Sequence, residues 1–264
     1  MTIRFLIPMM KRGPGRNGRR HQRRRRTSTA ASSRCFVPRF EALEDRTLLS
    51  TFSVLNLDDA GDGSLRQAIL DANERSGPDV IRFAPRLAGT ITLSGELRVT
   101  DDLRIDGPGA ARITVSGGGT TRVFAVSGEE TAVLIEGLTI AHGLTTATAT
   151  IALGGGILNT GASLTLDDVI MVGNRASGIE GANAGGGGVA NVLGGTLIVT
   201  QSSFQGNEVV AGAVASYGGA IFNDAGSTLT VERCSFIGNQ ATGALRVADS
   251  TTPIQGPQLS RRPS

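Results

Sequence analysis

The chain has 264 residues, of which 37 are glycine, with one tyrosine and no tryptophan. Its formal charge of +3 hides an asymmetry: residues 1–50 hold 13 basic and three acidic side chains, whereas residues 51–264 hold 13 basic and 20 acidic ones. These features exclude collagen, because the glycines lack a three-residue period; a transmembrane helix, because no apolar run is long enough; and a basic nucleic-acid-binding body.

The Arg-rich leader, residues 1–35, is predicted to be disordered. Residues 11–34 read KRGPGRNGRRHQRRRRTSTAASSR, in which like charges repel one another and few apolar side chains could form a core. Nucleic-acid binding is the alternative for this segment, but no aromatic side chain lies among the arginines to stack on bases. We therefore expect no nucleic-acid partner.

The next segment, residues 36–50, has a mixed composition and reads FVPRFEALEDRTLLS. Its central residues are Leu43, Glu44, Asp45, Arg46, Thr47, Leu48 and Leu49. They resemble the Leu-Glu-Pro-Arg-x-Leu-Leu sorting motif near the start of large secreted or surface bacterial proteins, with Asp45 in place of the proline. The resemblance implies a secreted or cell-surface protein. By spacing alone, the three leucines would form an ordinary amphipathic turn.

Residues 51–88 are predicted to form an N-terminal cap made of a strand, a helix and a second strand. Ser64, followed three residues later by Gln67, has the pattern of a helix capping box. Apolar side chains then fall on one face of the helix, at Leu65, Ala68, Ile69 and Ala72. The stretch resembles the segment that opens many secreted β-helix proteins, where it covers the first rung.

Three copies of one pattern follow at a nearly constant spacing, which varies by no more than one position. Each copy joins a glycine-rich hexapeptide to a strand that ends in Gly-Asn: GGGILN (154–159) with LTLDDVIMVGN (164–174), GGGVAN (186–191) with LIVTQSSFQGN (197–207), and GGAIFN (218–223) with LTVERCSFIGN (229–239). The asparagines form two series, Asn159, Asn191 and Asn223, and Asn174, Asn207 and Asn239. A degenerate fourth copy, LIEGLTIAHGL (134–144), places Leu144 at the asparagine position.

The repeat predicts an all-β fold, a single-stranded parallel β-helix over residues 89–245, in which equivalent residues of successive rungs stack in columns. Asparagine tolerates a positive φ at the corners, and stacked amides can bond to each other, so we expect two structural asparagine columns. The GGAI and FxxN tetrapeptides are similar to repeats of bacterial polymorphic outer-membrane proteins. That resemblance implies a right-handed, pectin-lyase-like fold, and residues 246–264 are predicted to be a disordered tail.

Two segments, residues 175–185 and 208–217, leave successive rungs at the same point and must emerge on one side of the solenoid. They are predicted to be loops, and as candidate binding residues they offer Val209, Val210, Val214 and Tyr217. These apolar side chains either fold back over a sheet, which we favour, or form a patch for a partner.

Catalytic chemistry is sparse in the repeats. The fold implied by the resemblance also occurs in pectin-degrading enzymes, which need clustered carboxylates, but Asp167-Asp168 is the only adjacent acidic pair here and strand neighbours point to opposite faces. His142-Gly143 is similar to a dipeptide of such hydrolases, although a turn histidine is the simpler interpretation.

We therefore predict a non-catalytic secreted or cell-surface protein with a binding, adhesive or structural role and no cofactor or metal. Its partner is unidentified, with a carbohydrate or another surface protein as the candidates. The alternatives are a polysaccharide lyase or glycoside hydrolase on the same fold, and a truncated fragment of a larger surface protein. Cys35 and Cys234 form no disulfide framework or metal motif, so the sequence leaves their redox state open.

Overall fold

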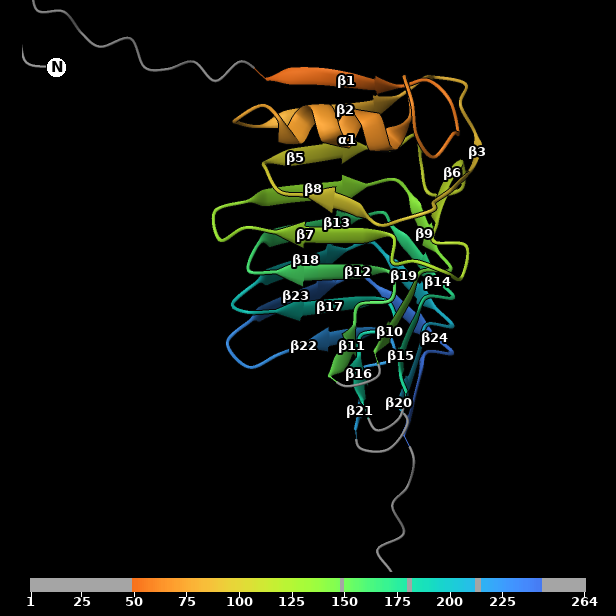
Figure 1. Ribbon diagram of the computed structural model, residues 1–264, viewed down its shortest axis with the longest axis vertical. Helices are drawn as coiled ribbons and strands as arrows, with labels where there is room; N and C mark the ends of the chain where they lie inside the picture. The colour runs from red at the N-terminus through yellow and green to blue at the C-terminus, as the bar shows by residue number, and fades with distance from the viewer. Residues whose placement is uncertain (1–48, 148–149, 180–181, 212–214, 244–264) are drawn as a thin grey trace, which may run out of the picture. The chain divides into compact units, whose positions relative to one another are not determined.

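The computed structural model describes residues 49–147, 150–179, 182–211 and 215–243, and it shows a right-handed parallel β-helix (Figure 1). The predicted fold class is confirmed. The predicted leader (1–35), most of the segment 36–50 and the predicted tail (246–264) lie outside the described residues. Across the described stretches, no helix has the length and apolar character needed to span a bilayer.

Three parallel sheets form the walls of the main stack. Sheet A contains β1 (Ser50–Val54), β2 (Asp79–Phe83), β5 (Leu103–Asp106), β8 (Ala132–Glu136), β13 (Ser163–Asp167), β18 (Thr196–Thr200) and β23 (Thr228–Glu232). Sheet B contains β3 (Gly89–Thr92), β6 (Ile113–Ser116), β9 (Thr139–Ala141), β14 (Ile170–Val172), β19 (Ser203–Gln205) and β24 (Ser235–Ile237). Sheet C contains β4 (Leu97–Val99), β7 (Phe124–Ser127), β12 (Ile157–Thr160), β17 (Val189–Val192) and β22 (Ile221–Asn223).

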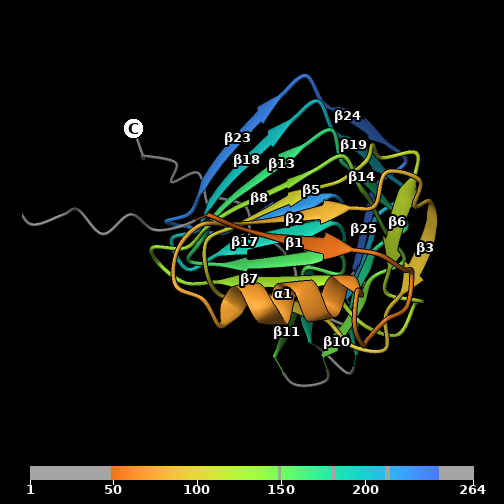
Figure 2. The same cartoon turned by 90° about the horizontal axis from the view of Figure 1, so that it is seen from above.

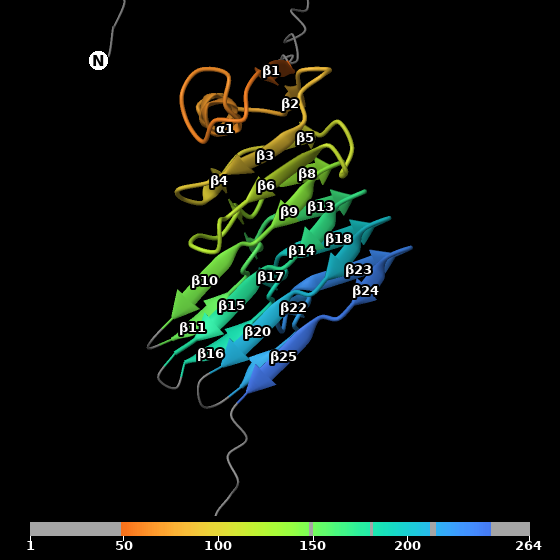
Figure 3. The same cartoon turned by 90° about the vertical axis from the view of Figure 1, so that its right-hand side faces the viewer.

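Two further sheets form what we call the arm, an outgrowth of the later rungs. Sheet D contains β10 (Leu144–Ala147), β15 (Arg175–Gly178), β20 (Glu208–Ala211) and β25 (Gln240–Gly243), stacked as Figure 3 shows, and sheet E contains β11 (Ile151–Leu153), β16 (Asn183–Gly185) and β21 (Ser216–Tyr217). The segments 175–185 and 208–217 therefore contain strands and are not the loops predicted. Each pairs with the equivalent segment of the next rung, a partner that local sequence patterns do not reveal.

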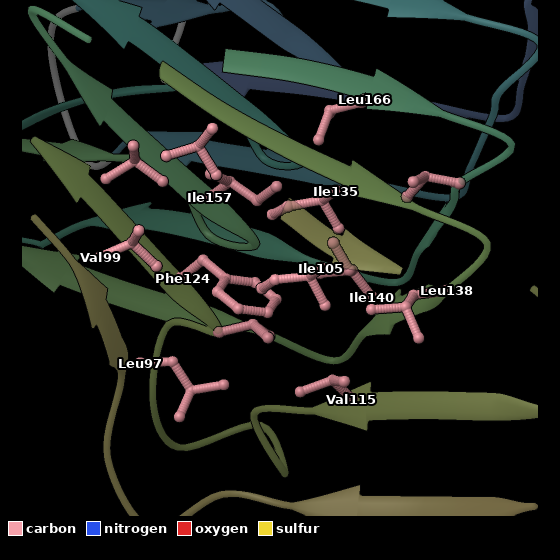
Figure 4. Packing of buried hydrophobic residues seen from close by; sticks show 14 of the residues in the cluster. Leu97, Val99, Ile105, Val115, Phe124, Ile135, Leu138, Ile140, Ile157 and Leu166 are labelled. Carbon is pink, nitrogen blue, oxygen red and sulfur yellow. The ribbon is translucent and has the colours of Figure 1, made fainter. Parts of the chain in front are cut away.

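The interior of the main stack is filled by columns of aliphatic side chains. Leu164, Leu197 and their neighbours on alternate strand positions are fully buried, whereas the residues between them face outward. Figure 4 shows Phe124, Ile105 and Ile140, from three different strands, pointing into the same space. The alternation of apolar and polar residues along each strand thus places one face of every rung in the core.

The N-terminal end of the stack is covered by α1 (Leu65–Asn73), which lies beside β1 in Figure 2 and also contacts β2 and β4. Its buried face is the one predicted: Leu65, Ala68, Ile69 and Ala72. The Ser64 hydroxyl accepts a hydrogen bond from the Gln67 N–H at 3.1 Å, as an N-cap should. The Gln67 side chain donates to Asp71 instead of back to Ser64, so only half of the capping box forms.

The degenerate fourth copy lies one residue earlier than expected. Val133 pairs with Leu164, and Leu144 pairs with Arg175, so Gly143 and not Leu144 occupies the asparagine position. The expected register was wrong because Val133 and Leu134 are both apolar, and the sequence does not show which of them points inward. Val133 is buried and Leu134 is half-buried on the outer side.

One corner absorbs a single-residue change in the period of the repeat. Ile157 pairs with Val189 on sheet C, but Leu164 pairs with Leu197 on sheet A, so the second of these rungs is longer by one position between the two sheets. The extra residue lies at the corner between sheets C and A, where Leu193 and Gly194 both have positive φ values of 56° and 79°. An exposed corner takes an insertion without disturbing the strand register on either side.

Candidate functional site

The two asparagine columns are present, and successive amides bond to each other at the corners of the rungs. In each pair the Nδ2 of one asparagine donates to the Oδ1 of the next, at 2.7–2.9 Å: Asn159 to Asn191, Asn191 to Asn223, Asn174 to Asn207, and Asn207 to Asn239. The first two members of each column are completely buried. The amides are thus bonded within the stack, which supports a structural role.

The expected reason for asparagine at these corners was only partly right. None of the six asparagines has a positive φ. In the second column the left-handed residue is the preceding glycine, as at Gly173, Gly206 and Gly238, with φ values of 61°, 57° and 64°. The asparagines therefore contribute their side-chain amides, while the neighbouring glycines provide the turn.

The arm has a small core of its own. Ala152, Ala176, Ala184, Val209 and Ala211 form a buried cluster separate from the main interior. Because these side chains are short, sheets D and E can approach closely. The arm is thus a packed extension of the scaffold that adds outer surface beside the corner where sheet B ends.

The candidate binding residues of the arm are placed differently from one another. Val209 is fully buried in the small core, whereas Val210 lies on the opposite side of β20 and is half-buried. Tyr217 is 44% exposed, and its ring lies 5.5 Å from that of Phe222. Val214 lies outside the described residues.

A surface hollow of about 400 Å³ lies where the solenoid corner meets sheet D. We call it the corner hollow, and its polar lining consists of His142, Thr146, Arg175 and Ser177, with Gly119 and Gly173 at its rim. Successive rungs contribute to it, because Leu144 pairs with Arg175 and Thr146 pairs with Ser177 across β10 and β15. Its volume falls in the range of about 300–1,000 Å³ typical of small-molecule sites.

His142 occupies an unfavourable backbone position in this hollow. Its φ is 49°, and it lies in the same column as Gly173, Gly206 and Gly238 of the following rungs. The His142 side chain is exposed. Two hydrogen bonds hold its backbone: the His142 N–H donates to the Val172 carbonyl, and the His142 carbonyl accepts from the Gly119 N–H. A side chain with a Cβ costs about 1–2 kcal/mol in the left-handed region, so an imidazole here has a cost that the glycines avoid.

The next rung makes room for the His142 ring. A Cβ placed on Gly173 would lie 3.0 Å from the His142 Nδ1, so only glycine fits beneath the imidazole without a shift. On the other side of the hollow, the Arg175 guanidinium pairs with Glu208 on the neighbouring strand at 3.2 Å. The hollow therefore gathers an imidazole, an anchored guanidinium and two hydroxyls, all of which can donate hydrogen bonds to oxygen atoms of a ligand.

The acidic pair Asp167-Asp168 is divided between the end of β13 and the corner that follows it. Asp167 accepts hydrogen bonds from the Thr200 hydroxyl at 2.6 Å and the Gln201 amide at 3.0 Å, and the bond from Thr200 is the main cause that lowers the pKa of Asp167. Asp168 turns the corner with a φ of 50°. Within the described ranges, no three His, Cys, Asp or Glu side chains come together as metal ligands would.

Of the residues that resemble a sorting motif, only Leu49 is described, and it is 60% exposed just before β1. Leu43, Glu44, Asp45, Arg46 and Leu48 lie outside the described residues, as does Cys35. Cys234 is a half-buried free thiol whose Sγ lies 3.2 Å from the Glu232 carbonyl oxygen.

The corner hollow was missed from the sequence, apart from His142 itself. Arg175, Thr146 and Ser177 carry no motif, and they meet only because strands of successive rungs pair in register. The one available signal was a histidine in a column otherwise held by glycine. When compared with models of protein families, with curated proteins and with solved structures, the chain gave no match.

Proposed function

We propose that the protein is a non-catalytic binding protein of the extracellular space or cell surface, in which the β-helix is a rigid scaffold and the corner hollow holds an oxygen-rich ligand. The observation that carries the proposal is His142, which takes a left-handed position where the next three rungs have glycine and opens into the same hollow as Arg175. Asp168, Leu193, Gln201 and Arg233 have similar φ values at other corners, and His142 differs from these four in lining the corner hollow.

The chemistry of the lining indicates the class of ligand. An imidazole, a guanidinium and hydroxyl groups donate hydrogen bonds to carboxylate and hydroxyl oxygens, so an acidic carbohydrate, or an acidic patch on another surface protein, fits best. Arg175 is held in place by Glu208, which orients its remaining N–H groups without burying the pair. The arm extends the outer surface next to the hollow, as an adhesive or structural role also requires.

The extracellular or surface location is proposed from the resemblance of residues 43–49 to a bacterial sorting motif. It can be tested by following the full-length chain in fractionated bacterial cells. Location in the medium or envelope supports the proposal, and retention in the cytosol contradicts it.

An enzyme on the same scaffold is the second candidate, favoured by the exposed His142 beside Arg175. In this case the imidazole would accept a proton from a bound sugar whose charge the guanidinium neutralises. Both candidates use the corner hollow, but only the enzyme would release a product.

The test is retention of the purified protein on immobilised acidic and neutral polysaccharides, followed by assay for released products. We expect retention on an acidic polysaccharide, loss of retention in Arg175→Ala, and no released sugar. Arg98→Ala is the matched control, since Arg98 is 75% exposed on sheet C, outside the corner hollow. Release of product that depends on His142 would replace the binding proposal with the enzyme, and retention that both variants keep would contradict both candidates.

A further inference from the structure

A second hollow, of about 420 Å³, lies at the edge of sheet A where its strands begin. We call it the leading-edge groove; it crosses the starts of β2, β5, β8 and β13 and is lined by residues that include Leu49, Asp79, Val80, Asp102, Leu134 and Ser163. Its walls are mainly apolar, and two of its polar groups are the carboxylates of Asp79 and Asp102.

Asp79 is the unusual member of this lining. It is only 3% exposed, and its Oδ1 accepts a hydrogen bond from the Ser50 N–H at 3.0 Å. Its Oδ2 is buried and has no hydrogen-bond partner among the described residues. An ionised carboxylate oxygen left buried and unpaired is strongly unfavourable, so this position calls for a donor, and most of all for a cation.

The described side chains around the groove do not supply that donor. Arg104 lines the groove, but its guanidinium is bonded to Glu136 on the next strand. Asp102 adds a second carboxylate one rung further on, where its Oδ1 accepts from the Ala132 N–H at 2.8 Å. The groove is therefore acidic and apolar, which suits a guanidinium flanked by aliphatic side chains.

We propose that residues 45–48, Asp-Arg-Thr-Leu, lie along this groove and that the Arg46 guanidinium pairs with Asp79 and Asp102. These residues directly precede Leu49, which lines the groove, and Ser50, whose N–H binds Asp79. The starts of β2 and β13 are three strand spacings apart, about 14 Å, and four extended residues span about 13 Å. Charge, length and point of attachment therefore all favour this segment of the chain's own sequence.

The inference does not rest on the proposed function, and it links two parts of the chain. Arg46 belongs to the segment that resembles a sorting motif. Docking in the groove holds that segment against β2, β5 and β8, so the motif is presented in a fixed position only once these rungs have formed.

Asp79→Asn in the full-length chain tests the proposal through the direction in which it shifts the urea midpoint of unfolding. Asparagine keeps the Oδ1 that accepts from Ser50 but removes the charge. If Arg46 pairs with Asp79, the variant should unfold at a lower urea concentration, whereas removal of an unpaired buried charge should raise the unfolding midpoint.

The partner is tested by Arg46→Ala in two backgrounds. We expect it to lower the urea midpoint of the wild type and to leave that of Asp79→Asn unchanged, independently of protein concentration. Asp106→Asn is the control background, since Asp106 pairs with Arg82 on the same sheet and does not line the groove. Arg39→Ala is the control for loss of a positive charge from the same segment.

A rise in the midpoint of Asp79→Asn, or an equal effect of Arg46→Ala in the wild type and Asp79→Asn, overturns the proposal. An effect of Arg46→Ala that grows with protein concentration would assign the groove to a second copy and also overturns it. If Asp79→Asn does not fold, Asp102→Asn replaces it, because Asp102 is half-buried and the same loss of coupling to Arg46 is expected.

Discussion

At the scale of single residues, the fold depends on buried amides that bond to each other from rung to rung, although the Asn159 Oδ1 at the start of its column has no partner among the described residues. Asn191 is completely buried; its Oδ1 accepts from Asn159, and its Nδ2 donates to Asn223 Oδ1 and to the carbonyls of Gly195 and Thr228 at 2.7–3.0 Å. Asparagine at this position could be predicted from the repeat. The reason it is needed, a four-way amide junction between rungs, could not, because its partners come from three different rungs.

Asn191→Ala should therefore be strongly destabilising. It leaves several buried groups without partners, so we expect a loss on the order of 3 kcal/mol or more in the free energy of unfolding measured with urea. Asn73→Ala is the control, because Asn73 also makes two side-chain hydrogen bonds but near the surface, and should cost about 1 kcal/mol. Equal losses in the two variants would contradict the column as a source of stability.

In contrast to Asn191, His142 is expected to lower the stability of the fold. His142→Gly removes a left-handed residue with a Cβ, worth about 1–2 kcal/mol, against about 0.5–1 kcal/mol for the greater freedom of glycine in the unfolded chain. We expect a net gain of up to about 1.5 kcal/mol, seen as a higher thermal midpoint, together with weaker ligand binding. Gly173→Ala should instead destabilise, since its Cβ meets the His142 ring. A less stable His142→Gly variant would show that the imidazole serves the fold.

At the scale of elements, side chains at the same column position differ from one rung to the next in how much they contribute to stability. Phe204 on β19 and Phe236 on β24 are paired in register, with ring centroids 5.0 Å apart, but Phe204 is fully buried and Phe236 is 48% exposed. The sheet order explains the difference, because β24 is the edge strand of sheet B within the described residues.

Phe204→Ala should cost about 3–5 kcal/mol, as for a buried aromatic side chain, and Phe236→Ala about half of that or less. Urea unfolding of the two variants measures both costs. Each variant is the matched control for the other, because the two phenylalanines occupy equivalent positions on neighbouring strands. Equal costs would mean that something covers the exposed face of Phe236 in solution.

The cap is tied to the first rungs by a charged clamp. Asp59 binds the Arg66 guanidinium of α1 at 2.7 Å and the Ser94 N–H beyond β3 at 3.2 Å. Burial raises the pKa of Asp59, but the hydrogen bonds from Ser94 and Arg66 outweigh it and hold the pKa below its ordinary value.

This clamp predicts acid sensitivity of the cap. Because the folded-state pKa of Asp59 is depressed, its contribution is complete above the unfolded-state value, about pH 4, and is lost as the pH falls through the folded-state value. Hydrogen exchange of α1 amides, followed from pH 5 downward, should accelerate relative to the later rungs. Asp59→Asn should remove that extra dependence, and an unchanged profile in the variant would contradict the clamp.

How far the sequence could predict these elements depended on how local their partners are. The capping helix and the repeat follow from periodicities within a few residues of Ser64 or within one copy. The arm did not, because short strands such as β15 and β20 resemble loops until each is paired with the next rung. The one-residue slip at Val133 arose in the same way, from two adjacent apolar residues that only cross-rung pairing distinguishes.

At the scale of the whole molecule, the first and last described rungs are covered to different extents. The N-terminal rungs are covered by α1, whereas β23 and β24, the edge strands of their sheets within the described residues, expose Leu229, Val231, Phe236 and Ile237. Each rung of a solenoid is stabilised mainly by its neighbours, so stability is expected to be highest in the middle of the stack. The corner hollow lies where sheet B passes into sheet D: β9 and β14 have paired neighbours on both sides, whereas β10 is the edge strand of sheet D in the described part of the chain.

The central claim, that the corner hollow is a binding site, is tested most directly by calorimetric titration of wild type and Arg175→Ala with the retained acidic polysaccharide, alongside their urea midpoints. Arg175 and Glu208 form an exposed pair, so the variant should unfold at nearly the wild-type midpoint. We predict at least a tenfold loss of affinity at unchanged stability. Unchanged affinity, or a loss of affinity that follows a loss of stability, would contradict the account.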